Sequence, residues 1–227
     1  MKHRLAILAF LITCSLLAAI LVLGGAFDTK REETINVLIQ DTYNNLHEMQ
    51  TFMLMSEIYG DEMACLAFRS RLKELDTTLW ELGIKLDRYR TATEEFQKDP
   101  FYLAQKKVFN ENEVFYLMLL EKVNRVCGYD QQVVSFFYAN SRDCRGCDDQ
   151  SFILTDIKRD VDQEVLIFSF DTDLNLTSVS LLEEYNGMGE LPCLVINGET
   201  FCGIRDREFI MQQVCRNATQ ATKMCGS

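Results

Sequence analysis

Two cysteines separated by two residues are the part of this sequence best suited to chemistry. Cys144-Arg145-Gly146-Cys147 follows an apolar run at 133–139 and precedes a helix predicted at 148–157. A cysteine in the first turn of a helix lies near unpaired backbone amides and the positive end of the helix dipole, which favour the thiolate. Two cysteines at this spacing can also open and close one disulfide. We therefore expect Cys144 to attack disulfides and Cys147 to resolve the mixed disulfide, without any cofactor.

Two other interpretations of the cysteine pair stay open: a fixed structural bridge, and part of a metal or iron–sulfur site. A structural zinc site needs four ligands, usually from a second C-x-x-C or from histidines. The chain has only His3 and His47 and no second C-x-x-C, so we predict no metal. Four thiolates, from the pair together with Cys193 and Cys202, would nevertheless be soft enough to hold one.

The charges around the pair act in opposite directions on the first thiol. Arg145 favours the thiolate of Cys144, whereas Asp143, Asp148 and Asp149 oppose it. The sign of the pKa shift is therefore not readable from the sequence, and the direction of electron flow stays open.

Overall charge limits the classes of partner. The 227 residues carry 34 acidic and 23 basic side chains, a formal charge of −11. This balance argues against nucleic acid, or an anionic lipid surface, as the main partner. The hydrophobic content of 48% is enough for one or two ordinary domains.

The N-terminus predicts a membrane anchor. Residues 5–27 contain no charged side chain, and a run of that length can cross a bilayer as a helix. A cleaved signal peptide has a shorter apolar core, although Gly24-Gly25-Ala26 leaves cleavage open. Lys2 and Arg4 should stay in the cytoplasm by the positive-inside rule, despite the weaker opposing signal of Lys30 and Arg31. We expect a single-pass cell-membrane protein whose chain from residue 28 onward is extracytoplasmic.

Cysteine usage agrees with that compartment. Cys14 lies in the apolar run, and an even number of cysteines remains outside it, which is typical of disulfide bonds in an exported chain. Apart from the C-x-x-C pair, the candidates for disulfides are Cys65, Cys127, Cys193, Cys202, Cys215 and Cys225.

Residues 28–128 predict an all-α hairpin or coiled-coil segment. Apolar residues recur at alternating steps of four and three. In the first two helices the seams comprise Ile35, Ile39, Thr42, Leu46, Met49 and Met53, then Leu72, Leu75, Leu79, Leu82, Leu86 and Tyr89. A third helix should begin at Asp99-Pro100, present Phe101, Val108, Phe115 and Leu119, and end before Gly128. We interpret these stripes as helix–helix core.

The second and third helices should fold back on each other around residue 96. Cys65 and Cys127 are equally far from that point in sequence, so the hairpin would bring them level. We therefore predict a Cys65–Cys127 disulfide at the far end of the hairpin, next to the redox domain.

Residues 129–227 change to short strands and helices. Runs at 133–139 and 164–170 flank the C-x-x-C helix as a β-α-β unit, and helices are expected at 177–185 and 206–216. Asn197-Gly198 predicts a two-residue hairpin turn. Counting outward from that turn pairs Cys193 with Cys202 at a non-hydrogen-bonded position, where a cross-strand disulfide can close.

The C-terminal part resembles the thioredoxin family across about residues 131–217. The strand, C-x-x-C and helix, the lone Pro192 entering the hairpin, and Gly203 at its end carry this resemblance. It implies a cis Pro192 packed beside the cysteine pair, with Cys144 the more exposed of the two and the Leu191 backbone available to an extended substrate. The chain departs from the family pattern in having Asp143 before the first cysteine and Phe136 in place of a buried acid.

Together these features predict a fold class: an α/β thioredoxin-like domain (β-α-β, α-β-β-α) at 129–227, preceded by a transmembrane anchor at 1–27 and helices at 28–128. The predicted function is a membrane-tethered thiol–disulfide oxidoreductase. Its partners would be exported protein thiols or disulfides and a membrane or extracytoplasmic electron-transfer partner. The alternative is a non-catalytic interaction module in which the cysteines are only structural bridges.

Overall fold

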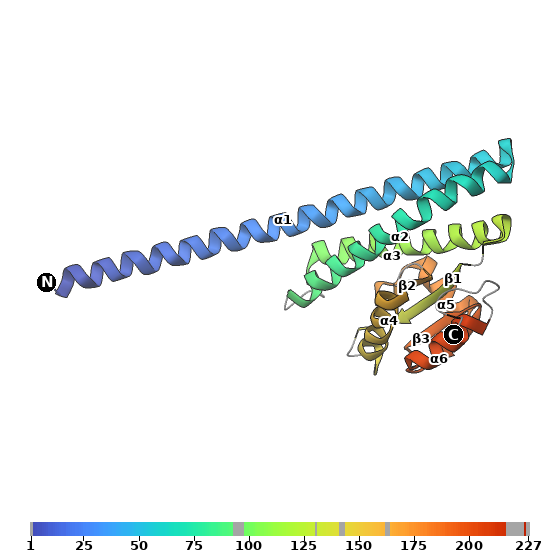
Figure 1. Cartoon of the computed structure of the whole chain (residues 1–227). Coiled ribbons are helices and arrows are strands. Elements are labelled where there is room, and N and C mark those ends of the chain that lie inside the picture. The colour runs from blue at the N-terminus through green and yellow to red at the C-terminus, as the bar shows by residue number, and fades with distance from the viewer. Residues whose placement is uncertain are drawn as a thin grey trace.

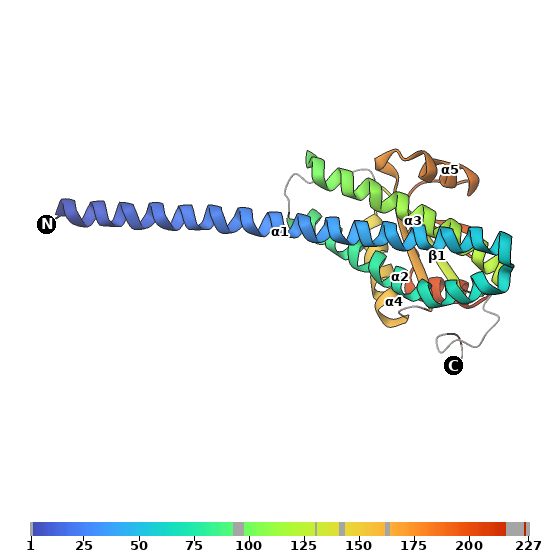
Figure 2. The ribbon, with the colours of Figure 1, turned by 90° about the horizontal axis from the view of Figure 1, so that it is seen from above.

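The computed structural model describes residues 2–92, 98–129, 131–140, 144–161, 164–216 and 225. Three long helices come first: α1 (Lys2–Tyr59), α2 (Asp61–Ala92) and α3 (Pro100–Cys127). Figures 1 and 2 show α1 as one unbroken rod, of which only the C-terminal half packs against the other helices. The predicted anchor and the first bundle helix are therefore one continuous helix.

Local signals set the ends of these helices. Gly60 has φ +94° and Gly128 has φ +63°, so both adopt the left-handed conformation that glycine tolerates best. Asp99 caps α3 by accepting a hydrogen bond from the Tyr102 amide at 3.0 Å, and Pro100 occupies the first turn. The predicted turn around residue 96 lies outside the described residues. Its flanks meet, since the Tyr89 hydroxyl donates to the Asp99 carboxylate at 2.8 Å.

The seams predicted for α1 and α2 are confirmed, except that Ile39 and Leu72 are only partly buried. The buried members are Ile35, Thr42, Leu46, Met49, Met53, Leu75, Leu79, Leu82, Leu86 and Tyr89. The seam predicted for α3 is confirmed only at Leu119, because Val108 is exposed and Phe101 and Phe115 are only partly buried. The buried aromatic residues are Tyr102, Phe109 and Tyr116. These residues follow the same period, shifted by one position, so the periodicity alone did not distinguish the two stripes.

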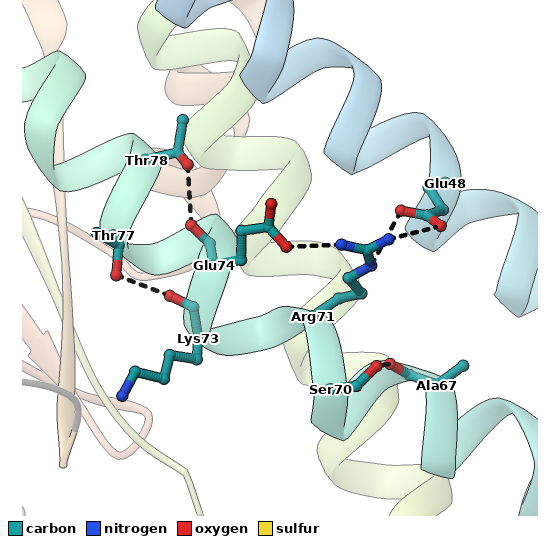
Figure 3. Close-up of polar contacts among 8 residues, drawn as sticks. All are labelled: Glu48, Ala67, Ser70, Arg71, Lys73, Glu74, Thr77 and Thr78. Atoms are coloured by element: carbon teal, nitrogen blue, oxygen red, sulfur yellow. Dashed lines mark hydrogen bonds and ion pairs between the residues drawn. The ribbon is translucent and has the colours of Figure 1, made fainter.

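Polar contacts also join α1 to α2. Arg71 of α2 lies between two carboxylates, with nitrogen–oxygen distances of 3.2 Å to Glu48 of α1 and 2.6 Å to Glu74 of its own helix (Figure 3). The hydrogen bond that Arg71 donates to Glu74 and the charges of both carboxylates raise the pKa of Arg71. These side chains remain in water, so the contacts fix the register of the helices more than they stabilise them.

The predicted disulfide at the distal end of the bundle, where α1 turns into α2, is confirmed. Cys65 and Cys127 are bonded with their Cα atoms 5.6 Å apart, which joins the start of α2 to the end of α3. The Tyr129 hydroxyl donates to the Cys65 carbonyl at 2.6 Å and holds the following chain against the same point.

A small mixed sheet follows the bundle. Its strands are β1 (Gln132–Tyr138), β2 (Val165–Asp171), β3 (Cys193–Ile196) and β4 (Glu199–Cys202), in the order β2-β1-β3-β4. β1 and β2 are parallel, whereas β3 is antiparallel to both β1 and β4. The connecting elements are α4 (Cys147–Val161), a 3₁₀ turn (Thr172–Leu174) and α5 (Thr177–Tyr185), and α6 (Arg207–Arg216) comes after β4.

The expected fold class, an α/β thioredoxin-like domain at the C-terminus, is wrong. The described residues are predominantly helical, with six α-helices and only this small four-stranded sheet. One hydrophobic core contains Leu120 of α3 together with Phe137, Phe168 and Phe170 of the sheet. The sheet therefore buries one face against the long helices, while other sheet residues, such as Phe136, form a second core with Ile157 of α4 and Val214 of α6. The sequence pattern missed this because it does not show which helix covers which face.

The free edge of β2 is covered by side chains of α3. The Asn110 side-chain oxygen accepts from the Asp171 amide at 2.7 Å, and Glu113 accepts from the Ser169 amide at 3.0 Å. An exposed strand edge is a template for unwanted pairing, and buried amides need acceptors. Asn110 and Glu113 meet both needs and attach the bundle to the sheet.

Candidate functional site

The C-x-x-C pair lies between β1 and α4, where the sequence placed it. Cys144 and Cys147 form a disulfide with their Cα atoms 5.6 Å apart, and Cys147 is the first residue of α4. The Cys144 amide donates to the Asn140 carbonyl at 3.1 Å, which closes the turn after β1. The helix start therefore holds both sulfurs in one small region, as disulfide exchange requires. Asp143, which was expected to oppose the thiolate, lies outside the described residues.

Both cysteines are covered by protein. Cys144 is 4% exposed and Cys147 is 2% exposed, so the expected difference in exposure is small. Ala139 lies in the same buried cluster, and Tyr138 and Leu191 pack against it. A substrate sulfur can approach within bonding distance only if part of this cover moves.

Gly146, in the turn between the two cysteines, lies directly against Ile204. Gly146 has φ +95°, and a Cβ built there would lie 2.4 Å from Cδ1 of Ile204. Any side chain at 146 would thus be strained in the backbone and would displace Ile204. Ile204 is itself 50% exposed, so its side chain lies between the cysteine turn and solvent.

The loop that carries Ile204 is fixed to α4. The Arg205 amide donates to the side-chain oxygen of Gln150 at 2.7 Å, and Gln150 is completely buried. The Arg205 guanidinium also donates to the Cys202 carbonyl at 2.9 Å. These contacts keep Ile204 over the first turn of α4. The sequence analysis missed these residues, because the burial of Gln150 and its contact with Arg205 join positions far apart in the chain.

Leu191 and Pro192 enter β3 beside the pair. The predicted cis peptide bond between them is confirmed, and the Pro192 carbonyl accepts from the Gly203 amide at 2.8 Å. The contact with the cysteine cluster is made by Leu191, whereas the resemblance implied it for Pro192. Arg145 is exposed next to the pair.

The predicted hairpin disulfide is also confirmed. Cys193 pairs with Cys202 across β3 and β4, and their Cα atoms are 4.0 Å apart. Asn197 and Gly198 both have positive φ, as a tight two-residue hairpin turn demands. Cys193 lies opposite Phe137 near the end of β1, so the second disulfide is close to the first. A fourth disulfide joins Cys215 of α6 to Cys225.

The charge of Asp148, at the start of α4, acts on Arg90 of the helical bundle. Burial lowers the pKa of Arg90 in α2, but the hydrogen bond and charge of Asp87, with smaller contributions from Tyr102 and Asp148, raise it overall. Asp148 and Asp149 are exposed in the first turn of α4. At the end of β1, burial raises the pKa of Tyr138 well above its ordinary value, so this phenol beside the cysteines stays neutral.

The four cysteines considered as a metal site are bonded in two separate disulfides. Bonded sulfurs do not act as thiolate ligands. Among the residues that the structure describes, no group of three or more His, Cys, Asp or Glu side chains is arranged to hold a metal ion.

Comparisons with protein-family models, curated proteins and solved structures gave no match. No family is therefore assigned, and the chemistry is inferred from the cysteines and their surroundings.

The N-terminal part of α1 is the remaining candidate for a functional contact. It is long and apolar enough to cross a membrane. Its apolar side chains, including Leu16, Ile20 and Leu21, are exposed along the helix, and no other part of the chain that the structure describes covers this stretch. Such a surface is unfavourable in water and requires an apolar environment.

Proposed function

We propose that this protein is a membrane-tethered thiol–disulfide oxidoreductase that works through Cys144 and Cys147. The observation that carries the proposal is a bonded C-x-x-C pair at the start of a helix, in a buried cluster with Leu191 of the cis Leu191–Pro192 bond. Helix-terminal amides favour a thiolate there, and a short loop allows the bond to open and close with little backbone movement.

The exchange proceeds in two steps. In the reduced protein the Cys144 thiolate attacks one sulfur of a substrate disulfide, and the other substrate sulfur leaves as a thiolate. The Cys147 thiolate then attacks the sulfur of Cys144, which closes the 144–147 disulfide and releases the second substrate thiol. Two electrons pass from the protein to the substrate, and the reverse sequence oxidises a dithiol.

We further propose that the apolar part of α1 spans the cell membrane with the N-terminus in the cytoplasm. Lys2 and Arg4 support this direction by the positive-inside rule. Four disulfides beyond residue 60 favour an oxidising compartment for the rest of the chain. In intact cells treated with a permeant reductant, an impermeant thiol reagent should label Cys144 without lysis. Labelling only after lysis would place the site in the cytoplasm.

A substitution tests the catalytic proposal. Cys147→Ala should leave Cys144 unable to release a bound substrate, so mixed disulfides with other proteins should accumulate on Cys144. Cys144→Ala is the matched control and should trap far less. Equal trapping by both variants would reverse or remove the assigned roles.

One observation favours a second function. Both cysteines are almost completely buried, as in a fixed structural bridge. The protein would then be an interaction module, and neither variant would form mixed disulfides.

A further inference from the structure

The strand that leads to the redox pair runs antiparallel to α3. At the start of β1, the Asn124 side chain contacts the Gln131 carbonyl at 3.5 Å. At its end, the Lys106 ammonium lies 5.5 Å from the Tyr138 ring. As residue numbers rise along β1, the residues of α3 that lie beside them have falling numbers, so the two elements are antiparallel. In Figure 1 the β1 arrow points back toward the side on which the N-terminus lies.

Helix α4 gives the same direction independently. Its first turn carries Asp148, whose charge acts on Arg90 near the end of α2. Its last turn carries Lys158, whose ammonium pairs with Asp76 at 2.9 Å, about four turns earlier in α2. The start of α4, and with it Cys147, therefore lies level with the C-terminal end of α2.

That end of α2 lies close to the apolar part of α1. The Arg31 guanidinium stacks over the Tyr89 ring at 4.0 Å. Arg31 is four residues beyond Phe27, the last residue of the uncharged run, which is about 6 Å along the helix. Asp99 of α3 accepts a hydrogen bond from Tyr89, and Lys106 lies about two turns, or about 11 Å, beyond Asp99, so the redox end of the sheet lies about 6–17 Å from that run. The headgroup layer on one side of a bilayer is about 5–8 Å thick.

We propose that the Cys144–Cys147 pair faces the bilayer surface and exchanges disulfides with a cysteine pair that another membrane protein holds within or just outside the headgroup layer. This inference rests on the proposed function and on membrane insertion of α1. The bundle extends outward from the membrane, whereas the strand that ends at the pair points inward. A cysteine pair held by another membrane protein therefore lies at a similar height and diffuses in the same bilayer. This gives it a high effective concentration at the Cys144–Cys147 pair.

The test uses the full chain in proteoliposomes with single-pass reporter helices. A low reporter carries one disulfide-bonded Cys-x-x-Cys immediately outside its apolar stretch, and a high reporter carries it 18 helical residues further out. Eighteen residues make five full turns and about 27 Å, so height changes without rotation. The matched variant of this protein has 18 helix-forming residues inserted between Phe27 and Asp28. A soluble disulfide-bonded peptide reports the intrinsic exchange rate.

The unaltered protein should reduce the low reporter at least about tenfold faster than the high one, because only the low reporter shares its height. The lifted variant should prefer the high reporter, and both proteins should react equally with the soluble peptide. Equal rates for both reporters, or an unchanged preference in the lifted variant, would overturn the proposal while leaving the redox function intact. Lack of exchange with every substrate would overturn both.

Discussion

Replacing Glu113 with glutamine should change how stability depends on pH. Burial raises the pKa of Glu113 to about 8, while the Lys106 charge and the hydrogen bond from the Ser169 amide lower it less. Because this pKa exceeds the unfolded value of about 4.3, the native state binds the proton more tightly. Stability is therefore fully present below the unfolded pKa and is lost as pH rises toward 8.

The magnitude follows from the size of the shift. Each pH unit between the two pKa values changes the free energy of unfolding by about 1.4 kcal/mol. Between pH 5 and pH 7 the stability of the wild-type protein should thus fall by about 3 kcal/mol relative to Glu113→Gln. Glutamine cannot ionise, and its side-chain oxygen can still accept from the Ser169 amide. Any fixed cost of imperfect hydrogen bonding cancels when the two pH values are compared.

Trp80 gives the assay, because it is the single tryptophan of the chain and lies in α2 against Lys158. Unfolding of the full chain in detergent micelles, followed by Trp80 fluorescence at pH 5 and pH 7, measures the difference. Glu111→Gln is the matched control, because it removes the same charge from an exposed position of α3. The reasoning fails if the stability gap between Glu113→Gln and wild type is the same at both pH values.

Two further substitutions test the packing around the site and the bundle. Gly146→Ala should lower the free energy of unfolding by about 1–2 kcal/mol in thermal unfolding, since the left-handed backbone disfavours alanine and Ile204 must move. Adding Ile204→Ala should restore only the steric part of this loss, and full recovery would contradict the backbone argument. Replacing Cys65 and Cys127 together with serine should cost about 4 kcal/mol in denaturant unfolding, because the bond closes a 62-residue separation, and an unchanged midpoint would contradict the role given to this bond.

Features with short-range causes could be predicted from the sequence. The Asn197-Gly198 turn fixes the hairpin register, and hence the pairing of Cys193 with Cys202. The helical repeat predicted that Cys65 would meet Cys127. Each of these depends on turn geometry and on the number of residues between two positions, and neither changes with the packing of the other elements.

Features that depend on packing between elements could not be predicted. One side of α3 packs against α1 and α2, and another side packs against the sheet. Its helical period alone therefore did not identify the core face. Asn110 and Glu113 are polar residues on a helix, and nothing nearby in sequence indicated that they would accept from β2. The cover of Ile204 over Gly146 likewise joins positions far apart in the chain. The fold class was wrong for the same reason.

A redox titration of the native full chain, with mass-spectrometric mapping of every cysteine, tests the central claim most directly. The proposed function predicts that the Cys144–Cys147 bond opens and closes reversibly while the Cys65–Cys127 bond stays intact, because the start of α4 favours a thiolate whereas Cys127 lies at the C-terminal end of α3. The account is contradicted if the 144–147 bond resists reduction until the protein unfolds, since the pair would then be a structural bridge.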